Sequence, residues 1–96
     1  MQVYVTPRAE RDFNRIIRYI RKKWGDSTAQ EFIHKSDAIF KLLRHFPSIG
    51  AIEVGEIRGF QLTPQTRILY RIKADKIVIL SFFQVRQNPN KKSSND

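Results

Sequence analysis

The chain contains no cysteine. Disulfide bonds and thiolate metal sites are therefore excluded, and the composition is consistent with a reducing compartment. The sequence also lacks any apolar run near the roughly 20 residues that a membrane-spanning helix requires. Its first residues do not contain the apolar segment of a signal peptide. These absences predict a cytoplasmic protein that works away from the membrane.

Acidic residues are scarce beside basic ones. The 96 residues include 9 Asp and Glu against 18 Lys and Arg, which gives a formal net charge of +9. A small domain this basic usually meets a polyanion or an acidic protein, although such a charge also serves solubility alone. The hydrophobic content of 41% is that of a globular chain. We expect one domain over residues 1–89 and a flexible polar tail over residues 90–96.

Apolar periodicity predicts two helices joined by a short turn. Thr6 and Pro7 form a start signal, as N-cap and first helical residue, and the first helix then extends to Trp24. A capping-box pattern at residues 27–30 starts the second helix. Pro47 ends it, because proline cannot continue a helix. The short connection predicts an αα-hairpin.

One side of the first expected helix is entirely basic, opposite its apolar side. A solvated helix face accounts for this stripe, and a ridge that follows a polyanion is the alternative. The stripe consists of Arg8, Arg11, Arg15, Arg18 and Lys22.

The histidines and carboxylates do not form a metal site. His34 and His45 lie on the second expected helix, separated by about 16 Å along its axis. Glu53, Glu56 and Asp75 form no recognisable catalytic or metal-binding pair. We therefore expect no metal and no cofactor.

β-Forming residues predict four strands, at residues 2–5, 56–62, 66–73 and 77–85, with a loop at residues 47–55. The element order β-α-α-β-β-β predicts an α+β domain. In it the N-terminal strand and the helical hairpin pack on a four-stranded, mainly antiparallel sheet. The other face of this sheet stays partly open and offers a surface for function.

The third expected strand displays arginines on that open face. Arg67 and Arg71 are four residues apart, so their side chains point to the same side of a strand. Guanidinium groups fixed on a sheet suit the binding of phosphate or carboxylate. Leu69 lies between them on the same side, which predicts a partner with mixed apolar and acidic contacts. The alternative for Arg71 is an ion pair with a carboxylate on a neighbouring strand.

Two further arginines are candidates for partner binding. Arg86 ends the last expected strand, and Arg58 lies in the strand before the turn at residues 63–65. The alternative for Arg58 is a structural ion pair with Glu53 or Glu56. Gly59 in the same strand predicts a bulge or a close approach of other atoms.

Several local motifs occur in a fixed order along residues 3–89. The first expected helix opens with TPRAERDF and closes with YIRKKWG, and the motifs RGF, TRILYRI and RQNP follow. These motifs occupy residues 6–13, 19–25, 58–60, 66–72 and 86–89. Together they resemble the RelE/ParE superfamily of type II toxins, the small toxins of bacterial toxin–antitoxin modules, and ParE-like plasmid-stabilisation toxins more than RelE-like ones.

This resemblance implies a growth-inhibiting toxin and a cognate antitoxin, and it leaves more than one activity open. ParE-type members inhibit DNA gyrase, whereas RelE-type members cut mRNA in the ribosomal A site. Both are neutralised by an acidic or amphipathic antitoxin segment that wraps the toxin. A non-toxic domain that binds nucleic acid or protein is the third alternative. The assembly, a homodimer or a hetero-oligomer with the antitoxin, is left open.

The residues expected for RNA cleavage are incomplete. Cleavage without a metal needs activation of the 2′-hydroxyl, stabilisation of the charge on phosphorus and a general acid. Arg67 matches a sheet arginine of the RelE-type pattern and is the candidate catalytic residue. However, residues 61–63 read Gln-Leu-Thr where lysines are expected, and no tyrosine follows Arg86. The sequence therefore favours the ParE-like role, inhibition of a target such as gyrase, and leaves open whether the protein is an enzyme.

Overall fold

Two helices and five strands make up residues 1–85, the part of the chain that this computed structural model describes. Arg86 and the expected tail at residues 90–96 lie outside this part. The elements are β1 (Gln2–Val5), α1 (Pro7–Trp24), α2 (Asp26–His45), β2 (Ala51–Val54), β3 (Ile57–Thr63), β4 (Thr66–Lys73) and β5 (Lys76–Gln84).

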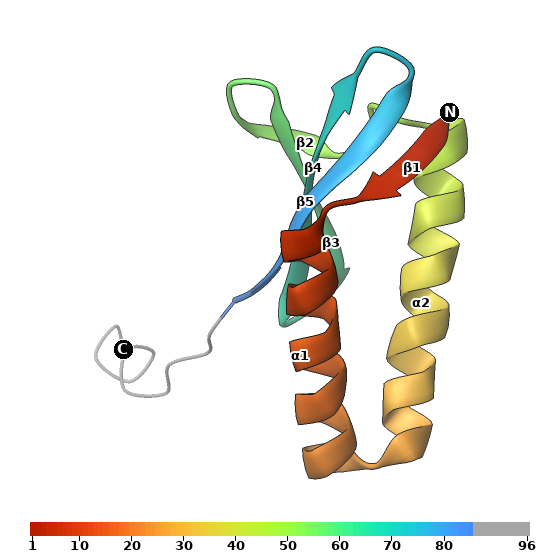
Figure 1. Ribbon diagram of the computed structural model, residues 1–96, viewed down its shortest axis with the longest axis vertical. Helices are drawn as coiled ribbons and strands as arrows, with labels where there is room; N and C mark the ends of the chain where they lie inside the picture. Colours follow the sequence, from red (N-terminus) through yellow and green to blue (C-terminus); the bar gives the residue numbers. More distant parts are fainter. Residues whose placement is uncertain (86–96) are drawn as a thin grey trace.

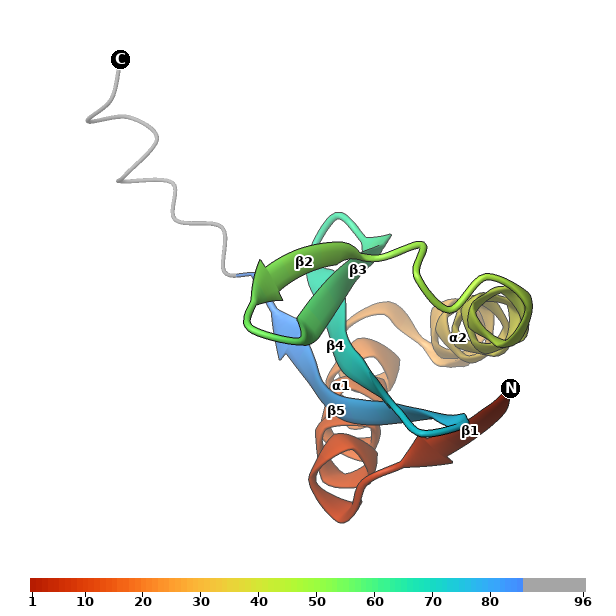
Figure 2. The same cartoon turned by 90° about the horizontal axis from the view of Figure 1, so that it is seen from above.

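The five strands form one mixed sheet in the order β1-β5-β4-β3-β2. Strand β1 pairs parallel with β5, and the other three pairings are antiparallel. Figure 1 shows α1 and α2 as an antiparallel pair beside the sheet, and Figure 2 shows the twisted sheet curving partly around α2. The predicted α+β architecture is confirmed, with five strands rather than four.

The core lies between the helical hairpin and one face of the sheet. Strand β4 alternates between buried side chains and half-buried ones, as expected for a strand with only one covered face. The buried apolar residues are Ala9, Ile16, Ile17, Ala29, Phe32, Leu43, Leu62, Ile68, Tyr70, Ile77, Ile79 and Phe82.

Two local expectations were wrong. The second helix starts at Asp26 after Gly25, which serves as N-cap with a φ of 99° and offers no side-chain cap, so no capping box is centred on Ser27. The segment expected to be a loop contains β2, which pairs antiparallel with β3. All four side chains of β2 are exposed. The strand is therefore held by backbone pairing and shows no alternation of apolar and polar residues.

Helix α1 covers the edge of β5 where β1 stops. The backbone N–H of Thr6 donates to the Ile79 carbonyl at 3.2 Å, and its hydroxyl donates to the Leu80 carbonyl at 3.3 Å. One turn into the helix, a carboxylate oxygen of Asp12 accepts from the N–H of Phe82 at 3.2 Å. Asp12 is only 5% exposed. These contacts satisfy backbone groups that would otherwise lie unpaired beneath the helix.

A second set of contacts fixes the segment between α2 and β2. The hydroxyl of Tyr70, which is fully buried, donates to the Pro47 carbonyl at 2.7 Å and accepts from the Gly50 N–H at 2.8 Å. Gly50 leaves no room for a side chain, because a Cβ there would lie 2.7 Å from the Tyr70 hydroxyl. The central strand β4 thereby determines where β2 begins.

We predict that Asp12→Ala lowers the free energy of unfolding by about 1–3 kcal/mol, since it leaves the buried N–H of Phe82 without an acceptor. Asp12→Asn, which keeps an acceptor oxygen, should lose less. Urea denaturation of the purified full chain measures both. Asp37→Ala, which removes an exposed carboxylate from α2, is the control, and an equal loss in that variant would contradict the assignment.

We also predict that Tyr70→Phe destabilises the fold by about 1–3 kcal/mol, because the buried Gly50 N–H loses its acceptor. For a domain of this size, each kcal/mol corresponds to a fall of about 4–8 °C in Tm. Thermal unfolding followed by circular dichroism measures the change. Tyr19→Phe, at an exposed tyrosine, should leave Tm unchanged, and a Tyr70→Phe variant as stable as the native protein would refute the prediction.

Candidate partner-binding site

The open face of the sheet carries Arg67, Leu69 and Arg71 on β4. They alternate with the buried residues Thr66, Ile68 and Tyr70, which agrees with the face that their spacing predicts. The cross-strand neighbours on β5 add Phe83 opposite Arg67, Ser81 opposite Leu69 and Val78 opposite Arg71. The face therefore mixes cationic and apolar side chains.

Arg67 is held by side chains of β3 and β2, which lie on the side of β4 away from β5. Its guanidinium forms an ion pair with Glu53 of β2, and Nη1 donates to the Gln61 side-chain oxygen of β3 at 2.7 Å. The absence of a side chain at Gly59 makes room for this pair, because a Cβ there would collide with both Arg67 and Glu53. The close approach expected at Gly59 is thus confirmed. The charge of Arg67 is largely compensated within the chain.

Arg71 is in a different situation from Arg67. Its Nε atom is buried without a hydrogen-bond partner, and Arg71 forms no ion pair within residues 1–85. The expected alternative, a carboxylate partner for Arg71, is therefore wrong for the described part of the chain. Glu53 of β2, which lies beyond β3 from β4, pairs with Arg67 instead.

Arg58 does not share the open face. It lies opposite the buried Tyr70 in the register of β3 and β4, so its side chain projects from the face that carries the core. Its Nη1 donates to the carbonyls of Ser48 at 3.1 Å and Gly50 at 2.8 Å. The expected ion pair of Arg58 with Glu53 or Glu56 is wrong, since Arg58 anchors the loop after α2. Arg86, the other candidate, lies outside the described residues.

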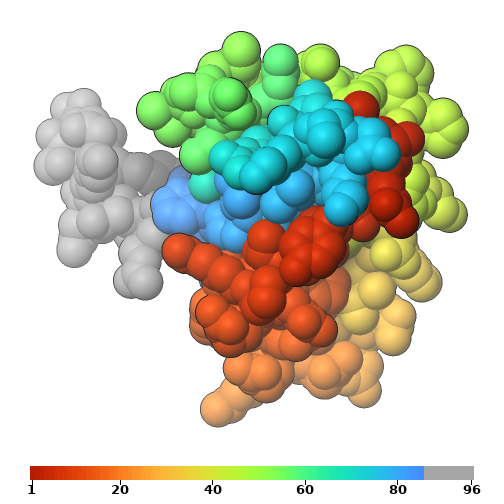
Figure 3. Space-filling model, turned by 45° about the horizontal axis from the view of Figure 1, so that its top comes forward, coloured from red at the N-terminus to blue at the C-terminus, as the bar shows by residue number. Residues whose placement is uncertain are grey.

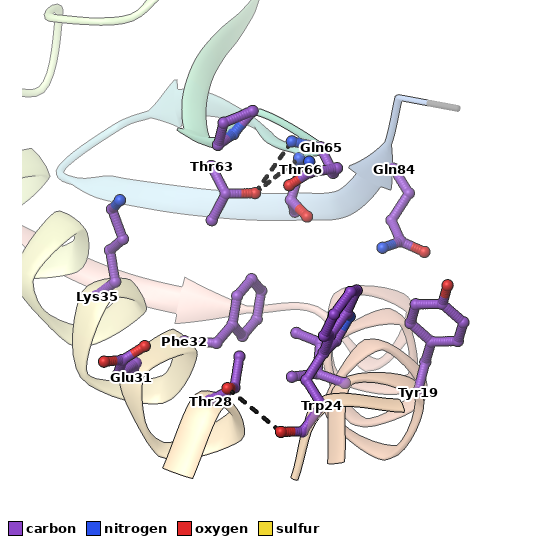
Figure 4. A pocket seen from close by; sticks show the side chains of 12 residues that line it. Tyr19, Trp24, Thr28, Glu31, Phe32, Lys35, Thr63, Gln65, Thr66 and Gln84 are labelled. Carbon is purple, nitrogen blue, oxygen red and sulfur yellow. Dashed lines mark hydrogen bonds between the residues drawn. The ribbon is translucent and has the colours of Figure 1, made fainter. Parts of the chain in front are cut away.

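A groove of about 460 Å³ runs between the helical hairpin and the ends of β3, β4 and β5. Figure 4 shows Trp24, Tyr19 and Phe32 lining its helical side, with Gln84 and the turn at residues 63–66 on the opposite side. Trp24 is 63% exposed and Tyr19 50% exposed. Exposed aromatic side chains that line a groove are typical of a protein-binding surface.

Polar groups surround this aromatic floor. Glu31, Lys35 and Gln84 line the groove, and the ammonium of Lys23 lies 5.7 Å from the ring centre of Tyr19 and 5.8 Å from that of Trp24. The groove did not follow from the sequence, because its two walls come from separate segments, residues 19–35 on one side and residues 63–66 and 84 on the other. The sequence contains Tyr19 and Trp24, but only the fold shows that both side chains are exposed.

The described part of the chain shows neither a metal-binding cluster nor a membrane-spanning helix. Within residues 1–85, no group of three or more His, Asp or Glu residues is arranged to hold a metal ion. No helix in this part has both the length and the apolar character needed to cross a membrane. The open face and the groove are the surfaces on which the functional argument is based.

Comparisons with known proteins agree with the fold. Residues 3–89 match the family "ParE toxin of type II toxin-antitoxin system, parDE". A solved structure described as a chromosomal ParDE toxin–antitoxin system from P. aeruginosa has 23% identity and a TM-score of 0.77, and covers 90% of this chain and 97% of that chain.

Two further solved structures show the same fold at lower similarity. A YoeB/ParE toxin from Agrobacterium tumefaciens has 12% identity and a TM-score of 0.67, covering 90% of this chain and 100% of that one. A YoeB dimer from Staphylococcus aureus has 14% identity and a TM-score of 0.60, covering 91% and 98%. No curated protein matches the chain. Because the family match spans nearly the whole length, the chain belongs to the ParE toxin family of type II toxin–antitoxin systems.

Proposed function

We propose that this toxin acts in the cytoplasm by binding a protein target such as DNA gyrase on the open face of its sheet, and that a cognate antitoxin neutralises it. The observation that carries the proposal is the state of Arg67, whose guanidinium already binds Glu53 and Gln61. A compensated arginine among apolar neighbours suits a protein interface better than it suits a phosphate chain, because interface cores are enriched in arginine and aromatic residues.

The neighbours of Arg67 support a protein partner. Phe83, its cross-strand neighbour, is 55% exposed, and Leu69 lies one pleat further along β4. Around Arg67 the described residues provide no lysine, histidine or tyrosine in the cross-strand row of Gln61, Arg67 and Phe83. This row therefore lacks a group that could protonate a leaving oxygen, as the general acid of RNA cleavage must.

One observation favours ribosome-dependent mRNA cleavage as the second candidate. Glu53 and Arg67 place a carboxylate beside a guanidinium. A carboxylate can accept a proton from a 2′-hydroxyl, and a guanidinium can stabilise negative charge on phosphorus. This candidate requires a general acid from elsewhere, either from the chain beyond residue 85 or from the ribosome.

The antitoxin segment fits the groove between the hairpin and the sheet. The groove has an apolar aromatic floor and a polar rim, which matches the apolar and polar sides of an amphipathic helix. The formal net charge of +9 favours an acidic partner. The exposed edge of β2 offers backbone groups to which an extended antitoxin segment could add as a further strand.

We predict that induced expression without an antitoxin arrests growth and that the purified protein inhibits gyrase supercoiling. Phe83→Ala should weaken the inhibition about thirtyfold or more, since an aromatic anchor in an interface contributes about 2 kcal/mol or more. Phe46→Ala is a matched control, because Phe46 is 59% exposed but lies at the end of α2. A supercoiling assay titrated with each variant measures the effect.

Each result that would contradict this proposal points to a different conclusion. Codon-phased mRNA cuts in primer extension that disappear in both Glu53→Gln and Arg67→Ala would replace the gyrase proposal with the ribonuclease. Growth arrest with neither effect would point to another target. Normal growth, despite folded protein in the cell, would favour the non-toxic binding domain.

Trp24 provides a test of the groove. It is the single tryptophan of the chain, so its fluorescence reports directly on what covers it. We predict that a bound antitoxin peptide shifts its emission to shorter wavelength and that Trp24→Ala weakens binding, measured by calorimetry, about thirtyfold or more. Binding that leaves both the emission and the affinity of Trp24→Ala unchanged would place the antitoxin elsewhere, with Phe46→Ala again as the control.

A further inference from the structure

A basic hollow lies on the open face at the opposite end of β4 from Arg67. It has a volume of about 440 Å³ and is formed around the β4–β5 turn and β1. In Figure 3 the chain around this turn (cyan) and β1 (red) lie close together on the visible face. Three strands contribute side chains to the hollow. The residues that line the hollow, two of them in the β4–β5 turn, are Tyr4, Arg71, Lys73, Ala74, Asp75, Lys76 and Val78.

The register explains why these side chains meet. Val78 of β5 lies between Arg71 of β4 and Tyr4 of β1, so that the guanidinium and the phenol flank one small apolar residue. In the next row, Lys73 and Lys76 are directly opposite each other. Like charges at directly opposite positions of an antiparallel pair destabilise it. The strand ends therefore place positive charge where an anion would relieve the repulsion.

Arg71 carries a hydrogen-bond donor that has no acceptor in the described part of the chain. Its Nε–H is buried and unpaired within residues 1–85, which is costly for a charged donor. An anion that reached Nε and Nη of Arg71 together would supply the missing acceptor with two of its oxygens. Such bidentate donation is the geometry that arginine forms with phosphate and carboxylate.

The charge of the hollow decides between these anions. Arg71, Lys73 and Lys76 supply three positive charges and Asp75 one negative charge, which leaves a net charge of +2. A phosphomonoester carries about −1.5 to −2 at neutral pH. A carboxylate or an internal phosphodiester carries only about −1, and would leave the two lysines partly uncompensated.

We propose that this hollow is a binding site for a phosphomonoester, with Arg71 as the bidentate donor, Lys73 and Lys76 as charge partners and the Tyr4 hydroxyl as a further donor. The ligand is either a small molecule such as a nucleoside 5′-monophosphate or the terminal phosphate of a nucleic acid. The site goes beyond the proposed inhibition of a protein target, and it stands whichever target the toxin acts on.

The test is a titration of the ¹⁵N-labelled full chain at constant ionic strength, followed by heteronuclear NMR. The added compounds are inorganic phosphate, a nucleoside 5′-monophosphate, and one short oligonucleotide with and without a 5′-phosphate. Shifts should be confined to the amides of Tyr4 and residues 71–78 and to the Nε–H signal of Arg71. Tight binding of the mononucleotide identifies a small ligand. A preference for the phosphorylated oligonucleotide identifies a nucleic-acid end.

Two variants of Arg71 separate the effect of bidentate donation from the effect of positive charge. Arg71→Gln should weaken binding about tenfold or more, and Arg71→Lys should weaken it less, because it keeps the charge but cannot donate in bidentate fashion. Lys22→Gln removes one charge from the basic stripe of α1 and should change nothing. Shifts spread over α1, an unchanged affinity in Arg71→Gln, or equal binding of the two oligonucleotides together with no binding of the mononucleotide would overturn the proposal. A failed gyrase assay would leave it intact.

Discussion

The buried carboxylate of Asp12 connects the two halves of this fold. Strand β1 pairs with β5 only as far as Ile79, and beyond that point the edge of β5 has no strand beside it. Asp12 accepts from the N–H of Phe82 there and also binds Arg15 at 2.8 Å. Helix α1 is thereby fixed against one face of the sheet. Because both helices are committed to that face, the opposite face is left for partners.

Strand β4 carries two arginines on the open face in different electrostatic surroundings. Its alternate side chains fill the core, while Arg67 and Arg71 share the other side. The two arginines have the same spacing and the same face but different neighbours. Arg67 lies beside β2 and β3, which supply Glu53 and Gln61, whereas Arg71 lies in the row of Val78 and Tyr4, which supplies no carboxylate. One strand thus presents a compensated cation at one end and an uncompensated one at the other.

Local signals in the sequence were sufficient for much of the fold. The first helix has the expected bounds because Thr6 caps it by accepting from the Ala9 N–H, and Trp24 ends it before Gly25. The common face of Arg67 and Arg71 follows from the two-residue period alone. These features depend on neighbours within a few residues, and such interactions can be identified without a fold.

Most of the errors concern strand pairing and register, which the side-chain pattern does not specify, and the start of α2 at Asp26 is a separate local error. Strand β2 has four exposed side chains, so only its pairing with β3 defines it, and the Glu53 that binds Arg67 was assigned to a loop for the same reason. The face of Arg58 depends on its register opposite Tyr70, which no local pattern specifies. Because register joins residues that are far apart in the chain, the state of each arginine could not be predicted from spacing.

The groove and the open face share the same strand ends, which bears on how one partner could block the toxin. Thr66 and Gln84 line the groove, and the adjacent residues Arg67 and Phe83 lie on the open face. An antitoxin helix seated against Trp24, as proposed, would therefore end beside the turn at residues 63–66. A continuation of that segment by a few residues past the turn would cover Phe83. Neutralisation would then need no change in the toxin's conformation, because Thr66 and Gln84, proposed to contact the antitoxin, are adjacent in β4 and β5 to Arg67 and Phe83, proposed to bind the target, and point to the opposite side of the sheet.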